Sequence, residues 1–223
     1  MSFKPYSFSK ISVYENCPRQ FKYKYIDKLP TAPKDMTPLL KGSAVHNILE
    51  NYPNKGTHKL QEKYQFIVDE FLDSDYKKLF DYPNLREQAI ALDDTLSPKP
   101  YGKNVLFRGY IDYMCFIDGI LHIIDWKTGK LKDLKYQNFN QLLFYSIYMF
   151  KKYPKVNQIK IRYVYIEHKL ENSILLDRKY LSKYINDLIT IIDKIENEKT
   201  FPKNKQVLCN WCDYQEFCNN DSL

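Results

Sequence analysis

Residues 105–130, VLFRGYIDYMCFIDGILHIIDWKTGK, constrain the fold more than any other segment, because their pattern predicts a β-hairpin. Asp118 and Gly119 separate two runs rich in β-branched and aromatic residues, and an Asp-Gly pair favours a two-residue turn in which both residues take positive φ. Counting outward from this turn places Asp112 opposite Asp125. Directly opposed Cβ atoms lie about 4.5–5.5 Å apart, so the two carboxylates repel each other unless a cation lies between them.

A lysine accompanies the two aspartates. Lys127 follows Asp125 by two residues, so the alternation of a strand puts its ammonium on the face that carries the carboxylates. A surface hairpin with these residues could equally be a solvated ion-pair cluster. Both strands are largely apolar on both faces, however, which indicates a covered position in a sheet, where opposed carboxylates are costly. We therefore expect a site for Mg²⁺ or Mn²⁺ that activates water beside a phosphodiester.

The composition suits a protein that binds a polyanion. Lys and Arg number 34 against 27 Asp and Glu, the net charge is +7, and the chain has 20 Tyr and 13 Phe. This balance suits DNA as a partner, although the nucleotide composition of a genome can also enrich Lys, Tyr, Asn and Ile. The first ten residues lack the apolar region of a secretory signal, and the longest apolar run, at 142–150, is shorter than the roughly 18 residues of a membrane span. We therefore expect a soluble, cytoplasmic protein with no membrane partner.

Four of the five cysteines form a pattern of their own. Cys209, Cys212 and Cys218 are clustered near the C-terminus, and Cys17 stands near the other end of the chain. Together they could supply four thiolates to zinc or to an iron–sulfur cluster, and the spacing alone does not choose between these metals. Unliganded thiols in a terminal loop are the alternative. An intracellular setting argues against disulfides, and Cys115, inside the hairpin, is expected to be a packed thiol.

Hydrophobic periodicity and the placement of Pro and Gly predict the remaining elements. Ser9 is expected to cap a short first helix, and Pro18 suits the first turn of the next one. Further helices are predicted over 38–52, 59–72, 76–96, 138–151 and 181–198, strands over 156–167 and 173–176, and a loop over 28–38. This order indicates an α/β core with an N-terminal helical elaboration.

Four short motifs, GSAVHNILE, RGYIDYM, IIDWKTGK and QLLFY, occur in this order. They resemble the PD-(D/E)XK nuclease superfamily, specifically its RecB-like exonuclease branch, although Ile111 stands where the proline of the superfamily's name is expected. Cys17 and the segment CNWCDYQEFC resemble the iron–sulfur version of this branch, which includes CRISPR-associated nucleases of spacer acquisition and the AddB nuclease domain. The likeness covers nearly the whole chain. It implies a restriction-endonuclease-like core, a mixed central sheet flanked by helices, with a four-cysteine segment that joins the two termini.

The resemblance also implies roles for individual residues. The catalytic metal would be bound by Asp112, Asp125, His46 and the backbone carbonyl of Trp126, and Lys127 would orient the attacking water and stabilise the developing charge. Two further residues, Gln141 and Tyr145, match an element that positions DNA and the lysine, although they could also form an ordinary helix face. The ligands of a [4Fe–4S] cluster would be Cys17, Cys209, Cys212 and Cys218, with zinc as the alternative occupant.

We expect one nuclease domain over 1–223, divided into an N-terminal segment (1–37), a helical region (38–100), a catalytic α/β core (101–200) and a cluster segment (201–223). The expected function is that of a metal-dependent exonuclease on single-stranded DNA or DNA ends. The alternatives are a non-catalytic nucleic-acid-binding module held by zinc or an iron–sulfur cluster, and a sequence-specific endonuclease of the same superfamily. Candidate DNA contacts are Arg19, Lys22 and Lys24 beside Phe21, Tyr23 and Tyr25.

The chain contains no G-x-x-x-x-G-K-[ST] sequence, so no helicase motor is expected beside the nuclease. A stand-alone nuclease or a subunit is therefore predicted. Its length suits a phage-encoded or CRISPR-associated protein, and its protein partners would act in recombination, replication or CRISPR adaptation.

Overall fold

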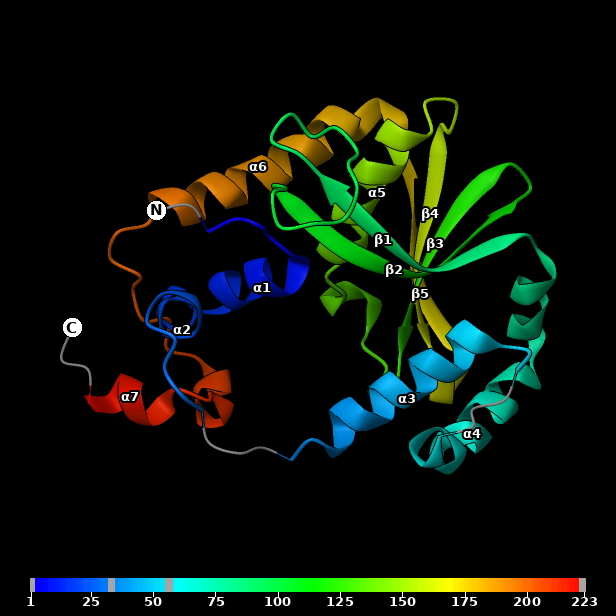
Figure 1. The fold of residues 1–223 in the computed structure, drawn as a ribbon, viewed down its shortest axis with the longest axis horizontal. Coiled ribbons are helices and arrows are strands. Elements are labelled where there is room, and N and C mark those ends of the chain that lie inside the picture. Colours follow the sequence, from blue (N-terminus) through cyan, green and yellow to red (C-terminus); the bar gives the residue numbers. More distant parts are fainter. Residues whose placement is uncertain (1–2, 32–34, 55–57, 221–223) are drawn as a thin grey trace.

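A five-stranded mixed sheet forms the centre of the molecule (Figure 1). The computed structural model describes residues 3–31, 35–54 and 58–220. Across the sheet the strands follow their order in the chain: β1 (Asn84–Leu92), β2 (Phe107–Ile117), β3 (Ile120–Lys127), β4 (Gln158–Tyr165) and β5 (Leu170–Asp177). All neighbours are antiparallel except β3 and β4, which are parallel and are joined through helix α5 (Asn140–Lys152). Parallel neighbours require such a crossover.

The predicted hairpin is confirmed as the pair β2 and β3. Asp118 and Gly119 form its turn with φ values of 50° and 79°, as an Asp-Gly turn of this kind requires. The pairing runs from Ile117 opposite Ile120 to Tyr113 opposite Ile124, which is the register that counting from the turn predicts. The hairpin occupies the middle of the sheet and is covered on both faces.

The predicted helix over 76–96 is wrong. A 3₁₀ helix, η2 (Asp75–Asp81), is followed by strand β1 over Asn84–Leu92, so the predicted helical region 38–100 ends in a strand. The segment NLREQAIAL contains several good helix formers, which explains the error. Pairing with β2 overrides this local preference, because it leaves Ile90 and Leu92 at most 1% exposed.

The other predicted helices are confirmed. The helices of the described residues are α1 (Phe8–Asn16), α2 (Pro18–Phe21) with its π-helical continuation η1 (Lys22–Ile26), α3 (Thr37–Asn51), α4 (Lys59–Leu72), α5, α6 (Leu181–Asn197) and α7 (Gln215–Asn220). The side chain that caps α1 is Ser7 rather than Ser9, because Ser7 Oγ accepts from the N–H of Lys10 at 3.3 Å. Pro18 is in the first turn of α2, as predicted.

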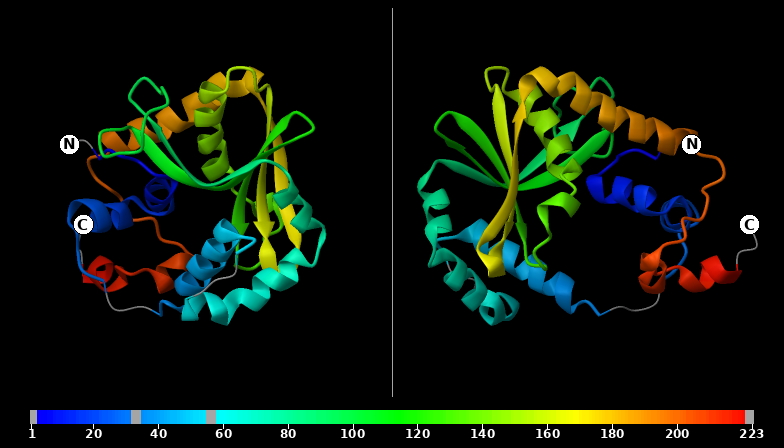
Figure 2. Two further views of the ribbon diagram at one scale, coloured as in Figure 1. Left: turned by 45° about the vertical axis from the view of Figure 1, so that its right-hand side comes forward. Right: turned by 180° about the vertical axis from the view of Figure 1, so that it is seen from behind.

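Two hydrophobic cores lie on the two faces of the sheet. Side chains of α1, α5 and α6 pack against one face, and side chains of α3 and α4 pack against the other. Figures 1 and 2 show the two groups of helices on opposite sides of the strands. No helix in the described ranges is long and apolar enough to cross a membrane.

The N-terminal helices and the C-terminal segment lie side by side at one edge of the molecule (Figure 2). Arg19 Nε donates to the carbonyl of Phe201 at 2.8 Å, and the rings of Phe21 and Phe201 stack with centroids 6.1 Å apart. Asn204 Nδ2 donates to the carbonyl of Asn16 at 2.8 Å. The N-terminal helices and the C-terminal segment therefore form one lobe, which we call the terminal lobe (residues 8–26 and 201–220).

Candidate active site

Strand pairing is interrupted at Asp112 on both edges of β2. The ladder with β1 continues on each side of Glu87 and Asp112 but omits these two residues, and Glu87 has a φ of 46°. The ladder with β3 ends at Tyr113 opposite Ile124, one residue before Asp112. The N–H of Trp126 donates to Asp112 Oδ2 at 2.8 Å instead. The break holds the Asp112 carboxylate between its two neighbouring strands.

His46 reaches this carboxylate from α3. Its Nε2 is 2.8 Å from the carbonyl oxygen of Trp126, and because a carbonyl only accepts, Nε2 carries the proton of the neutral ring. The lone pair of Nδ1 therefore faces Asp112 Oδ2, which is 3.4 Å away. Burial lowers the pKa of His46 and favours this neutral form. Two acceptors that face each other at this distance need a proton or a cation between them.

Negative charge is concentrated around these residues. Burial, followed by the charge of Asp125, raises the pKa of Asp112 well above its usual value, and Glu87 adds to the rise. The N–H of Trp126 opposes the shift only in part. Burial, then the charges of Glu50 and Asp125, also raises the pKa of Glu87. When its carboxylates are ionised, the site is electrostatically unfavourable. A bound divalent cation would offset the repulsion between them.

Three ligand atoms of His46, Glu87 and Asp112 lie within 4.8 Å of one another, and no other His, Cys, Asp or Glu residues in the described part of the chain form such a group. Imidazole nitrogen with carboxylate oxygens is a donor set that suits Mn²⁺, and carboxylates suit Mg²⁺. These residues therefore fit a catalytic metal. Sequence reasoning missed Glu87, because a helix over 76–96 hides its position opposite Asp112. Ile90, Ala91 and Leu92 are all buried, so the sequence here carries no clear alternation that would have indicated a strand.

Asp125 lies beside this group without belonging to it. It is 4% exposed, and Lys127 Nζ approaches its Oδ2 at 2.5 Å. Among the described residues, Asp125 Oδ2 is the one buried side-chain oxygen or nitrogen without a hydrogen bond. The ammonium of Lys127 offsets the charge of this carboxylate without the geometry of a hydrogen bond. A buried carboxylate oxygen without a hydrogen bond is costly, and a metal ligand is a common reason to keep one.

Tyr163 supports the lysine and was also missed from the sequence. Lys127 Nζ lies 4.8 Å from the centroid of the Tyr163 ring, a cation–π distance. Tyr163 pairs with Asp125 in the parallel ladder between β3 and β4. Only the register between these strands places the tyrosine there, and a single sequence does not reveal that register.

The predicted pair Gln141 and Tyr145 lies on α5, on the sheet face that bears Asp125. Tyr145 is 6% exposed, and its hydroxyl is hydrogen-bonded by the Gln141 side chain and by the backbone of Tyr110. Burial raises the pKa of Tyr145, and the charges of Asp125 and Asp112 raise it further, so the phenol stays protonated. The ring lies against the backbone of Gly109, where an added Cβ would be 2.5 Å from Cε1 of Tyr145.

The metal-ligand group opens to solvent on one side. A pocket of about 560 Å³ is lined by His46 and Glu87 together with Gly42, Ser43, Glu50 and Thr128. Helix α3 forms one wall, and Thr128, the residue that follows Lys127, forms part of the rim. A substrate can therefore reach the ligand atoms without disturbing the two cores.

The sequence matches a family model over nearly its full length. Residues 5–219 match the model of the PD-(D/E)XK nuclease superfamily. The chain belongs to the PD-(D/E)XK nuclease superfamily. It is therefore a nuclease, a hydrolase of a superfamily that uses Mg²⁺ or Mn²⁺, and its helix-flanked mixed sheet is the restriction-endonuclease-like fold that the motifs predicted.

One solved structure shares this fold, and a second resembles it more weakly. One from Eubacterium rectale, described as a "Putative exonuclease", is 16% identical with a TM-score of 0.55, and the match covers 97% of this chain and 88% of that one. Another, described as SSO0001, is 15% identical with a TM-score of 0.42, and the match covers 96% and 86% of the two chains. A search of curated proteins gave no match.

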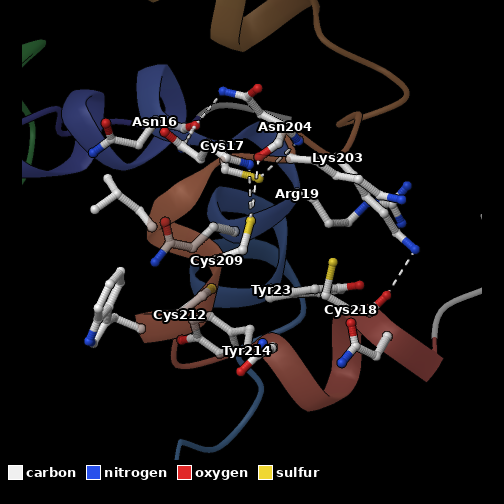
Figure 3. A pocket seen from close by; sticks show the side chains of 17 residues that line it. Asn16, Cys17, Arg19, Tyr23, Lys203, Asn204, Cys209, Cys212, Tyr214 and Cys218 are labelled. Atoms are coloured by element: carbon white, nitrogen blue, oxygen red, sulfur yellow. Dashed lines mark hydrogen bonds between the residues drawn. The ribbon is translucent and has the colours of Figure 1, made fainter.

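The four cysteines that the motif analysis singled out line one pocket in the terminal lobe of the nuclease (Figure 3). Its volume is about 580 Å³, and Tyr23, Tyr214 and Arg19 also line it. All four thiols are free and partly exposed, whereas Cys115 is buried in the core between the sheet, α3 and α4, as predicted. The fold thus brings Cys17 together with the three thiols of the C-terminal segment.

No three of the described cysteines have sulfurs within 4.8 Å of one another. Four thiolates around one pocket are a donor set for zinc or for an iron–sulfur cluster.

Three of the candidate DNA contacts are wrong. Arg19 is 7% exposed and donates to Phe201, while Phe21 and Tyr23 are 0% and 5% exposed. Phe21 packs in the core of the terminal lobe, and Tyr23 packs against Tyr214 with ring centroids 5.8 Å apart. These rings cannot stack on bases without unfolding the lobe.

Proposed function

We propose that this nuclease is a metal-dependent exonuclease of the RecB-like branch that hydrolyses single-stranded DNA or DNA ends. The observation that carries the proposal is the group of ligand atoms from His46, Glu87 and Asp112 within 4.8 Å of one another, beside the buried Asp125 and Lys127. The order of the four sequence motifs supports the choice of branch.

The chain's own donors would hold the ion. Ligand atoms of His46, Glu87 and Asp112 lie within 4.8 Å of one another, and the Trp126 carbonyl has a second lone pair available. Asp125, whose Oδ2 has no hydrogen bond, would be a further ligand. When bound, Mg²⁺ or Mn²⁺ supplies Lewis acidity that activates water and offsets the charge of the scissile phosphate. The pKa values of Asp112 and Glu87 are raised by burial and by neighbouring carboxylates, so a bound cation would favour their ionised forms.

Lys127 changes partners in this mechanism. Its ammonium pairs with Asp125 at 2.5 Å. With Asp125 as a metal ligand, the ammonium would be able to hydrogen-bond the attacking water and a phosphate oxygen, and the Tyr163 ring, 4.8 Å away, would keep it at the site. Tyr145 and Gln141 brace β2 next to Asp112 through the backbone of Tyr110.

For the cysteine pocket we propose a [4Fe–4S] cluster bound by Cys17, Cys209, Cys212 and Cys218. The free thiols and the shared pocket support it, and zinc is the alternative. The cluster would stabilise the terminal lobe rather than take part in hydrolysis. Five free cysteines also favour the reducing cytoplasm, and we place the enzyme in DNA recombination, replication or CRISPR adaptation.

End-labelled single-stranded and double-stranded DNA tests the proposal. The anaerobically purified protein is incubated with each substrate and Mg²⁺, Mn²⁺ or EDTA. Progressive shortening that EDTA abolishes is the expected result. Discrete bands would indicate a sequence-specific endonuclease instead, and binding without cleavage in either metal would overturn the proposal in favour of a non-catalytic module. A brown protein with broad absorption near ~400 nm supports iron and sulfide, whereas zinc is colourless.

A further inference from the structure

The loop that follows the catalytic lysine is unusually exposed. We call residues 128–137, TGKLKDLKYQ, the basic loop; all residues from 129 to 136 are exposed. Three of them are large and apolar: Leu131 is 39%, Leu134 is 54% and Tyr136 is 73% exposed. Lys130, Lys132 and Lys135 alternate with them along the chain. Exposed apolar side chains between cations are typical of a binding surface rather than of a solvated connection.

The base of the basic loop is held firmly. Asn172 Nδ2 donates to the carbonyl of Lys132 at 2.8 Å, and the hydroxyl of Tyr165 donates to Gln137 Oε1 at 2.6 Å. Asn172 is 9% and Tyr165 is 3% exposed, so both anchors belong to the body of the sheet. Between the anchors, Asp133 Oδ1 caps the short helix η3 (Leu134–Tyr136) through the N–H of Lys135. Tyr136 is thus presented on a fixed support.

Both ends of the basic loop meet the active site. Thr128 lines the pocket that contains His46 and Glu87. Two residues beyond the loop, Phe139 stacks on Tyr163 with centroids 5.5 Å apart, and Tyr163 supports Lys127. Figure 1 shows the connection between β3 and α5 running beside α3. The basic loop therefore begins at the pocket of the metal-ligand group.

We infer that the basic loop binds an unpaired DNA strand next to the scissile phosphate, with Tyr136 stacking on a base and Lys130 and Lys132 contacting phosphates. This inference rests on the proposed nuclease function and adds the residues that would select an unpaired strand. The charge of the loop favours this occupant, because its one carboxylate, Asp133, pairs with Lys135 at 3.4 Å and leaves an excess of two cations. A ring can stack only on a base that is exposed, so the loop selects single strands over intact duplex.

Binding of a fluorescein-labelled oligonucleotide, measured by anisotropy in EDTA, separates recognition from cleavage. Tyr136→Ala is expected to weaken single-strand affinity at least about fivefold, while Tyr136→Phe and Tyr136→Trp keep it, because stacking needs only the ring. Affinity for a blunt duplex of the same sequence should change less than about twofold. Because Tyr136 is 73% exposed, its substitution leaves the fold intact, which the melting temperature checks.

Tyr180 provides a matched control. It is 50% exposed, and Lys179 Nζ lies 5.0 Å above its ring, just as Lys135 Nζ lies 4.8 Å above that of Tyr136. Tyr180 follows Asp177, which pairs with Gln158 at the start of β4, whereas the active site is at the other end of that strand. Tyr180→Ala should therefore bind single strands like the wild type.

The lysines are tested by salt dependence. Each phosphate contact contributes about 0.7 to the slope of log affinity against log salt for a single strand, so Lys130→Ala combined with Lys132→Ala should reduce the slope by about 1.4. An unchanged slope, or equal losses for single strand and duplex in Tyr136→Ala, overturns the inference. So does a loss of affinity in Tyr180→Ala as large as that in Tyr136→Ala.

Cleavage assays keep the two proposals apart. If the wild type cleaves DNA and Tyr136→Ala binds and cleaves single strands equally well, the role of the loop is refuted and the nuclease function stands. If the wild type binds single strands through Tyr136 but cleaves none in Mg²⁺ or Mn²⁺, the proposed exonuclease function is refuted and the loop remains a single-strand binding surface.

Discussion

The active site and the cysteine pocket are two candidate metal sites that the protein builds in opposite ways. In the active site, helix α3 and the sheet strands β1 and β2 bring the ligand atoms of His46, Glu87 and Asp112 within 4.8 Å of one another. In the terminal lobe, the cysteines lie on short helices and turns, all partly exposed, and the sulfurs are farther apart. Val207 and Trp211, beside these cysteines, are 75% and 72% exposed.

If the two proposals hold, the metals have different purposes. The fold holds the carboxylates of the active site together against their repulsion, so a metal there would serve chemistry. The C-terminal part of the terminal lobe has little apolar cover beyond Tyr214 and Phe201, so a metal bound by the cysteines would serve structure. The following predictions test this division, from the largest expected effect to the smallest.

Loss of a cluster ligand should have the largest effect. Structural metal sites can stabilise a small unit by about 10 kcal/mol, so Cys209→Ser should unfold residues 203–220 and expose them to protease, while the sheet remains folded. Limited proteolysis with mass spectrometry measures this. Cys115→Ala is the matched control, because Cys115 is buried outside the pocket, and it should keep both colour and protease resistance. Equal resistance in Cys209→Ser would contradict a structural role for the metal.

Removal of the catalytic ammonium should abolish turnover without unfolding the protein. Lys127→Ala is expected to lower the cleavage rate by about 10³-fold, because a preorganised donor to the transition state is lost, while DNA affinity stays near that of the wild type. Asp125→Ala should lose at least as much activity. Lys183→Ala changes a surface lysine that pairs with Asp187 at 3.0 Å, and it should cleave normally. Normal cleavage by Asp125→Ala would refute the site.

Gly109 is predicted to act through Tyr145. A Cβ at Gly109 would be 2.5 Å from the tyrosine ring, so Gly109→Ala must displace it, and a shift of about 1 Å near a catalytic carboxylate can cost about 10²-fold in rate. Tyr145→Ala removes the clash. In the Tyr145→Ala protein, Gly109→Ala should cause no further loss of cleavage rate. The effects of the two substitutions on the rate are then not additive. Additive losses would show that Gly109 acts independently of Tyr145.

Gly102→Ala serves as the control for this cycle. A Cβ at Gly102 would meet its nearest atom, the carbonyl oxygen of Pro100, at 3.9 Å, an ordinary contact. This variant should cleave DNA at the wild-type rate. Its melting temperature should also remain close to that of the wild type.

Asp112 should give the smallest effect, and one of opposite sign. The pKa of Asp112 is higher in the folded protein than in the unfolded chain. The stability that protonated Asp112 contributes is therefore fully present below the pKa of the unfolded chain. It is lost as the pH rises through the pKa of the folded protein. In EDTA at pH 8, Asp112→Asn should therefore melt higher than the wild type, by roughly 2–4 °C for each kcal/mol regained. The difference should vanish near pH 4.

Calorimetry with added Mg²⁺ completes this test. The ion should stabilise the wild type more than Asp112→Asn, because the variant has lost a charged ligand. Asp187→Asn, a surface substitution, should show neither effect. A wild type that melts higher than Asp112→Asn in EDTA at pH 8 would contradict the electrostatic description of the site.

The sequence predicted the parts of the fold that local chemistry determines. The Asp118-Gly119 turn and the pairing from Ile117 to Tyr113 follow from residue type and counting, and the helix over 59–72 follows from its periodicity. Motif order then placed His46, Asp112, Asp125 and Lys127, and the structure brings all four close together.

The predictions that the structure contradicts depend on contacts between distant segments. Good helix formers around Glu87 predicted a helix, and only pairing with β2 makes this segment a strand. Tyr163 reaches Lys127 through the register of a parallel pair whose strands are separated by α5. The candidate DNA contact Arg19 is buried because residues near the other end of the chain cover it.

The contact between Arg19 and Phe201 also bears on how the protein is made. These residues are 182 positions apart, and Phe21 stacks on the same phenylalanine. During synthesis the first helices leave the ribosome 182 residues before the segment that completes their core, so they must wait for it. A chain that stopped before Phe201 would leave Arg19 without this partner.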